Sequence, residues 1–334
     1  MRKYYTNLIM LEYVQKEGIF CQGRGWQIHF ESNPLCGIQV RQPSSTFDLN
    51  GEPAKEIVVY ATSAERAQFI ADLVLAAHCL YGGELSTFEQ MPVFENRATT
   101  TGEIAEQLMA GGGKSLGVHN LPISCLITAK TSQRIAFQLA IFKYLLSCQT
   151  VPLSARALDP EGDWESGKVM SGVPRECVFN ANAIVLAYSV LEELSFEIRA
   201  SEENPSMING HWNPQVRKDL EERLTKGRIN LLEHILWHLR DTPTKIERKR
   251  SPVRIRKCEW AGFKVRDVYL DVVEAIAYAS WLRSRVSSHA LGRLARSPTI
   301  YDVANVQHLA RRLLLETLGF WRYYSKEAST QDMV

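Results

Sequence analysis

Residues 280–290 read Ser-Trp-Leu-Arg-Ser-Arg-Val-Ser-Ser-His-Ala, and this stretch decides how the second half of the chain is interpreted. It places Arg283 and His289 near the end of an apolar-periodic segment, 268–287, which predicts a long helix. A second long helix is predicted directly afterwards, over 302–323. An arginine offers a rigid fork of donors to phosphate oxygens, and a histidine exchanges a proton near neutral pH. The pair at one helix end therefore indicates chemistry on a phosphate.

Helical periodicity also dominates the chain that precedes this stretch. It begins at about residue 124, and it predicts helices over 132–148 and 180–200. Residues 215–241 are predicted to form one or two further helices, and the basic segment 245–266 is predicted to be irregular or β-like.

The first 120 residues have a different character. Short stretches of alternating or β-branched residues predict strands at 26–30, 37–40 and 56–60. Ser63 is a candidate N-cap for a helix over 64–80, and a short helix is predicted at 103–109. The expected architecture is therefore mainly α, with an N-terminal α+β module over 1–120 and a helical bundle over 121–334.

Bulk composition constrains the class of protein and its compartment. The net charge of +2 is nearly neutral, but residues 1–130 hold 10 basic and 13 acidic side chains whereas residues 131–334 hold 29 and 24. The seven cysteines are odd in number and include no Cys-x-x-Cys pair, which favours a reducing, cytoplasmic location over a disulfide framework. We expect no membrane span and no signal peptide, because no apolar run is long enough.

The arrangement of Arg283, a polar Ser284, four further residues and His289 resembles the signature of the HEPN superfamily. In that family the motif ends the third core helix of a bundle of about four helices. Residues 181–197 resemble the second helix of the family, and the segment from Tyr301 resembles the helix after the motif. The resemblance covers about residues 124–325, with an insertion at about 201–266 that is longer than in minimal members.

The resemblance implies metal-independent cleavage of RNA, in which the ribose 2′-hydroxyl attacks the adjacent phosphate. His289 would be the general acid or base, and Arg283 would stabilise charge on the phosphate. Ser284 is a further candidate, and an acidic residue of the second helix, Glu192 or Glu193, would fix the arginine or the histidine. Of these two, Glu193 is the one assigned to the catalytic set. The resemblance further implies a homodimer with two motifs at one cleft.

Some residues allow a second interpretation. Arg285 lies four positions before His289, one helical turn away, and competes with Arg283 for the role of functional arginine. Ser284, Glu192 and Glu193 fit equally well as polar residues on a solvated helix.

A basic segment precedes the motif helix. Residues 245–266 hold nine basic and two acidic side chains, which attract phosphate-rich partners. Trp260 and Phe263 lie among them as candidates for stacking on bases. The predicted RNA-binding residues are Arg248, Lys249, Arg250, Arg254, Arg256, Lys257 and Arg285.

Other motifs carry less weight. The run Gly111-Gly-Gly-Lys-Ser115 lacks the earlier glycine and the preceding strand of a phosphate-binding loop, so it predicts a linker. His234 and His238 have the spacing of metal ligands on one helix, but Ile235 occupies the position where the metalloprotease motif needs glutamate. The sequence therefore predicts neither a metal site nor a cofactor.

Two functions from different classes remain open. The first is a HEPN-type endoribonuclease, a class that includes toxins and anti-phage defence effectors, whose N-terminal module would sense a trigger or bind a regulatory protein. The second is a non-catalytic module that binds RNA or a partner protein through the basic segment. Loss of cleavage in His289→Ala would favour the first.

Overall fold

The computed structural model describes residues 1–10, 18–32, 41–42, 45–46, 55–82, 93–96, 121–151, 174–209, 211–240, 252, 254–258, 263–288 and 298–322. The chain divides into two compact units, Met1–Gln138 and Leu139–Val334. The helix that follows the predicted boundary at residue 120 belongs to the first unit. Within the described ranges, no helix combines the length and apolar character that a membrane span requires.

An antiparallel sheet forms the base of the first unit. Its order is β1-β6-β3-β2, with bounds β1 Arg2–Met10, β2 Gly18–Gly23, β3 Trp26–Ser32 and β6 Lys55–Ala61. The strands predicted at 26–30 and 56–60 are confirmed as β3 and β6, whereas β1 and β2 were not predicted. Two-residue strands, β4 Arg41–Gln42 and β5 Ser45–Thr46, pair separately. The strand predicted at 37–40 and the helix predicted at 103–109 lie outside the described residues.

Two helices pack on this sheet. Helix α1 spans Ala64–Gly82, close to the prediction of 64–80, and it packs against α3, Leu121–Thr131. Alternate strand residues such as Trp26, Ile28 and Phe30 are fully buried beneath them. The Cys21 thiol donates a hydrogen bond to the Cys125 carbonyl at 3.4 Å, which joins β2 to α3. The five cysteines whose side chains are described are free and buried.

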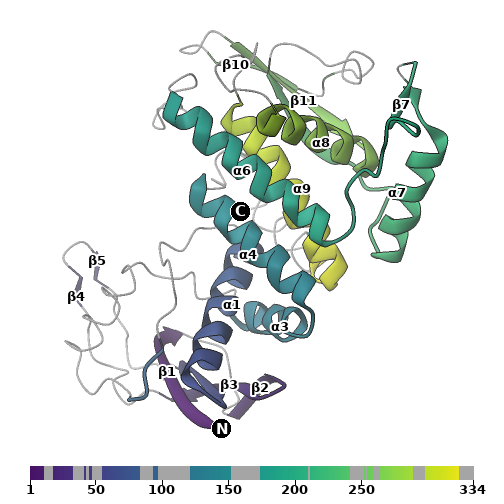
Figure 1. Cartoon of the computed structure of the whole chain (residues 1–334). Helices are drawn as coiled ribbons and strands as arrows, with labels where there is room; N and C mark the ends of the chain where they lie inside the picture. The colour runs from purple at the N-terminus through teal and green to yellow at the C-terminus, as the bar shows by residue number, and fades with distance from the viewer. Residues whose placement is uncertain are drawn as a thin grey trace. The chain divides into compact units, whose positions relative to one another are not determined.

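Four helices pack together in the second unit, and Figure 1 shows them in teal, green and yellow. Their bounds are α4 Ile135–Thr150, α6 Pro174–Glu193, α8 Val272–Ser288 and α9 Ile300–Leu318. Helix α6 packs against both α8 and α9. Buried Ser147 of α4 donates a hydrogen bond to the Ala183 carbonyl and accepts one from Gln307, so it joins α4 to α6 and α9.

The predicted helix ends differ from the observed ones where the backbone turns. Helix α9 ends at Gly319, whose φ of 80° is the left-handed conformation that glycine adopts most readily, and not at residue 323. Helix α6 ends at Glu193 instead of residue 200, because Ser195 also has a positive φ, of 61°.

The segment 215–241 contains a strand that the helical prediction missed. Helix α7, Pro214–Lys226, is followed by β9, Ile235–Arg240. With β10, Arg254–Cys258, and β11, Phe263–Leu270, this strand forms an antiparallel sheet of order β10-β11-β9. The β-like prediction for the basic segment is confirmed where it is described. A short hairpin, β7 Met207–Ile208 and β8 His211–Trp212, precedes α7.

The described residues are thus mainly helical, with one three-stranded and one four-stranded sheet. The second unit is more than a helical bundle, since β9 packs against α9 and both β9 and β11 contact α8. The sheet leads directly into α8, so it positions Arg283 and the residues around it.

The end of β2 yields a test of the first unit. A Cβ on Gly23 would lie 2.6 Å from Cε2 and 2.8 Å from Cζ2 of the buried Trp26 ring. We expect Gly23→Ala to lower the free energy of unfolding by about 1–3 kcal/mol, because the core must shift to admit the methyl group. Urea denaturation measures the change. The neighbouring exposed variant Gln22→Ala is the control, and equal stability of the two variants would contradict the packing described.

Candidate functional site

Helix α8 begins with a reciprocal cap that fixes its direction. The Asp271 carboxylate accepts a hydrogen bond from the Glu274 amide at 2.7 Å, and the Glu274 carboxylate accepts one from the Asp271 amide at 3.3 Å. The apolar residues Val272, Ile276 and Ala279 are buried on one face of the helix. Arg283 continues this face in the last turns of the helix, where its side chain is half-exposed.

Arg283 contacts the neighbouring helix α6. Its Nη2 donates a hydrogen bond to Glu192 Oε1 at 3.2 Å, and its guanidinium carbon lies 5.9 Å from the centre of the Tyr188 ring. Burial raises the pKa of Tyr188, so its ring stays neutral beneath the cation. The side chains of Arg283 and Glu192 are 42% and 38% exposed, so the ion pair orients the arginine while contributing only about 0–1 kcal/mol to stability.

Glu193 has a different partner. Its Oε1 lies 2.5 Å from Nζ of Lys143 in α4, and both side chains are partly buried. Adjacent residues of a helix point about 100° apart, so Glu192 and Glu193 face different neighbours. Of the two acidic candidates, Glu192 forms an ion pair with Arg283, whereas Glu193 forms one with Lys143.

The remaining candidates of α8 are separate from this ion pair. Arg285 has its guanidinium carbon 5.0 Å from the centre of the exposed Trp281 ring, a stacking contact, and Ser284 is exposed. His289 lies outside the described residues, one position beyond the end of α8 at Ser288. The structure therefore describes the arginine half of the motif.

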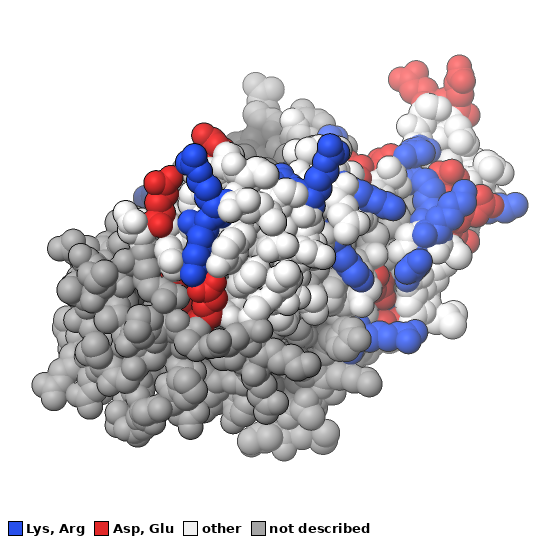
Figure 2. Space-filling view, turned by 90° about the horizontal axis from the view of Figure 1, so that it is seen from below, with Lys and Arg blue, Asp and Glu red and all other residues white. Residues whose placement is uncertain are grey.

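The basic segment is described only in part. Arg254, Arg256 and Lys257 lie in β10, and the half-buried Arg266 lies in β11. Arg248, Lys249 and Arg250 lie outside the described residues, as does Trp260. Figure 2 views the molecule from below, and on that face the described basic side chains lie among acidic ones.

A buried polar cluster in the second unit was not predicted. His238 of β9 makes a 2.7 Å hydrogen bond through Nδ1 to Asp267 of β11, and its backbone amide donates to Asn305 Oδ1 of α9 at 2.9 Å. The Asn305 amide returns a hydrogen bond to the His238 carbonyl at 2.7 Å. His238 and Asp267 are each 2% exposed. His234 is exposed and precedes the strand, so the prediction of two histidines on one helix is wrong.

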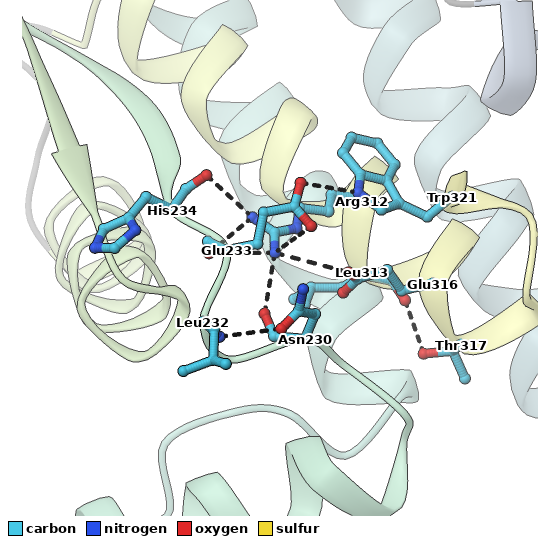
Figure 3. Close-up of polar contacts among 9 residues, drawn as sticks. All are labelled: Asn230, Leu232, Glu233, His234, Arg312, Leu313, Glu316, Thr317 and Trp321. Atoms are coloured by element: carbon cyan, nitrogen blue, oxygen red, sulfur yellow. Dashed lines mark hydrogen bonds and ion pairs between the residues drawn. The ribbon is translucent and has the colours of Figure 1, made fainter. Parts of the chain in front are cut away.

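Arg312 forms a second buried polar cluster, drawn in Figure 3. Its side chain is 1% exposed, and its two terminal nitrogens donate hydrogen bonds of 3.2–3.4 Å to the carbonyls of Asn230, Glu233 and His234. Nη2 also lies 3.5 Å from a Glu233 carboxylate oxygen and 3.7 Å from one of Glu316. A buried guanidinium needs this many acceptors, so the cluster is a structural tie between α9 and the start of β9.

Comparison of the chain with protein-family models, with curated proteins and with solved structures found no match. Among the described residues, no group of three or more histidine, cysteine or acidic side chains is arranged to hold a metal ion.

Glu316 gives the second unit a pH-dependent stability. Burial raises its pKa to about 7; Arg312 opposes this shift and the Glu233 carboxylate adds to it. The folded state thus retains the proton that the unfolded chain releases near the ordinary value of 4.5. The contribution of this proton to the free energy of unfolding is fully present below about pH 4.5 and is lost as the pH rises through about 7.

We therefore expect Glu316→Gln, which mimics the protonated group, to gain stability relative to the unsubstituted protein as the pH rises. The difference in free energy of unfolding should change by up to about 3 kcal/mol between about pH 4.5 and pH 8. Urea denaturation across this range measures it, with the exposed Glu222→Gln as control. A difference that does not vary with pH would contradict the raised pKa.

Proposed function

We propose that the protein is a metal-independent endoribonuclease of the HEPN type, with Arg283 and His289 in its active site. The observation that carries the proposal is the placement of Arg283 at the end of α8, half-exposed and oriented by Glu192 of the neighbouring α6. Among the described residues, one partly exposed carboxylate holds this cationic fork, which retains donors for a phosphate. Packing of α6 against both α8 and α9 further supports it.

The proposed reaction is a transesterification within RNA. The ribose 2′-oxygen forms a bond to the adjacent phosphorus while the bond from phosphorus to the 5′-oxygen breaks, which leaves a 2′,3′-cyclic phosphate. His289 takes the proton from the 2′-hydroxyl or gives one to the leaving 5′-oxygen. Arg283 stabilises the charge that develops on the phosphate oxygens. In a homodimer, two copies of the motif would supply the base and the acid.

Glu192 has a positioning role in this proposal. Its carboxylate fixes the guanidinium of Arg283, and the Tyr188 ring provides a neutral surface under it. The basic residues of β10 and of the segment before it would bind the RNA backbone. The first unit would respond to a trigger or to a regulatory protein, as in HEPN toxins and defence effectors.

The first test is cleavage of single-stranded and transfer RNA in excess chelator. We expect the unsubstituted protein to produce cyclic-phosphate ends, and His289→Ala to lose at least about a hundredfold in rate. Arg283→Ala should lose a similar factor, because it removes the stabilisation of the phosphate charge, whereas Arg285→Ala removes only a predicted RNA-binding residue and should lose less. Circular dichroism checks that the variants fold. Equal cleavage by the protein and His289→Ala would disprove the site.

A second test separates the two acidic residues of α6. Glu192→Gln should lower the cleavage rate several-fold and leave the affinity for RNA nearly unchanged, because the arginine loses its orientation. Glu193→Gln is the matched control on the same helix, and we expect full activity from it because its partner is Lys143. A larger loss in Glu193→Gln than in Glu192→Gln would reverse the assignment.

The alternative, a module that binds RNA or a partner protein without cleavage, predicts a different pattern. Neutralising Arg248, Lys249 and Arg250 together would then abolish binding in a salt-dependent manner, while His289→Ala would bind normally. Filter binding of labelled RNA at several salt concentrations distinguishes the two functions.

A further inference from the structure

A pocket of about 610 Å³ lies in the first unit, where several chain connections meet. Its walls come from the β2–β3 turn, the link from β6 to α1, the first turn of α1, and the link from α3 to α4. Among the described residues, the lining consists of Arg24, Gly25, Thr62, Arg66, Ser132 and Gln133. These side chains include two cations and no carboxylate.

The backbone around the pocket is held in place by local interactions. Gly25 has a φ of 78°, which allows the tight turn between β2 and β3, and its carbonyl accepts a hydrogen bond from the Thr62 amide at 3.2 Å. The Ser63 hydroxyl accepts a hydrogen bond from the Arg66 amide at 3.2 Å and so caps α1. The two arginines are thus carried by elements that are tied together.

The described neighbours of the two arginines orient them without neutralising their charge. Arg66 Nη2 donates a 3.4 Å hydrogen bond to the Arg24 carbonyl, and its guanidinium carbon lies 5.3 Å from the centre of the Phe69 ring. Neither arginine forms an ion pair with a carboxylate in the described part of the chain. A carbonyl and a ring orient a guanidinium without cancelling its charge.

One carboxylate lies close by, on the same helical turn. Glu65 is fully exposed, and its interaction with Ser63 lowers its pKa, so it is ionised at neutral pH. It is not part of the lining, and its single charge is opposed by two arginines and by the positive end of the 19-residue helix α1. The lining therefore remains cationic.

The polar groups between the arginines suit an oxygen-rich ligand. The exposed side chains of Thr62 and Gln133 line the pocket and have donors to offer. The Ser132 hydroxyl donates to the Ala129 carbonyl at 3.1 Å and retains acceptor capacity for a ligand hydroxyl. Two guanidinium forks with neutral donors between them complement a doubly charged phosphate better than a singly charged carboxylate.

We propose that this pocket binds the phosphate group of a small ligand, either free phosphate or a mononucleotide. Its volume is within the range of small-molecule sites. The site belongs to the first unit and does not depend on the ribonuclease proposal, so either proposal can fail while the other holds.

The test is calorimetric titration of the full chain with inorganic phosphate, with adenosine 5′-monophosphate and with adenosine. We expect both phosphate-bearing probes to bind at millimolar concentrations or below and adenosine not to bind. Equal affinities would identify free phosphate as the ligand, and tighter binding of the monophosphate would identify a nucleotide. Absence of binding by both phosphate-bearing probes, or equal binding of adenosine and its monophosphate, would overturn the proposal.

Two substitutions locate the binding. Arg24→Ala and Arg66→Ala should each weaken phosphate binding about tenfold or more, since each removes charge-assisted hydrogen bonds. Arg199→Ala, an exposed arginine of the second unit, is the matched control and should bind as the unsubstituted protein does. Arg24 is exposed in a turn, so its loss leaves the fold intact. Unchanged affinity in both pocket variants would overturn the assignment.

Discussion

The second unit is organised around a buried positive charge. At 1% exposure the two terminal nitrogens of Arg312 need acceptors, and these are mostly backbone carbonyls of one short segment, 230–234. Backbone acceptors constrain the path of a chain directly, because a carbonyl cannot reorient without moving the backbone. The segment must therefore pass α9 in one arrangement, and that arrangement sets where β9 begins. Removal of one partner from such a cluster costs about 3–5 kcal/mol.

The constraint extends from β9 to the candidate site through successive contacts. The Asn305 side chain makes paired hydrogen bonds with the backbone of His238, which fixes β9 on α9. The His238 ring then bonds to Asp267, which aligns β11 beside β9. Strand β11 ends at Leu270, and the Asp271 cap starts α8 at once. The polar contacts of Asn305, His238 and Asp267 thus help to fix where α8 begins, and with it the position of Arg283.

Local periodicity in the sequence predicts the helices of both units, but it does not predict the polar contacts that join one element of the second unit to another. In the segment after α7, Leu231, Leu232 and Ile235 fit a helical stripe and predict a helix. Ile235, Trp237 and Leu239 also alternate as the buried residues of a strand do. The hydrogen bond that holds this segment as a strand comes from Asn305, which is 67 residues away along the chain from its partner His238. Likewise, no local rule separates Glu192 from Glu193, because the difference depends on which helices pack on either side.

Exposure distinguishes the His238–Asp267 pair from the end of α8 as a place for chemistry on a phosphate. The His238–Asp267 pair has the geometry in which a carboxylate orients an imidazole, but each residue is 2% exposed and enclosed by Asn305 and the Tyr301 ring. A polymer as large as RNA has no access to an imidazole in such a position, so this pair stabilises the fold. Arg283 is 42% exposed, and its counter-ion in the described part of the chain, Glu192, is itself partly exposed, so the arginine is accessible to a phosphate. The half-exposed end of α8, rather than the buried histidine, is accordingly the place for which we propose phosphate chemistry.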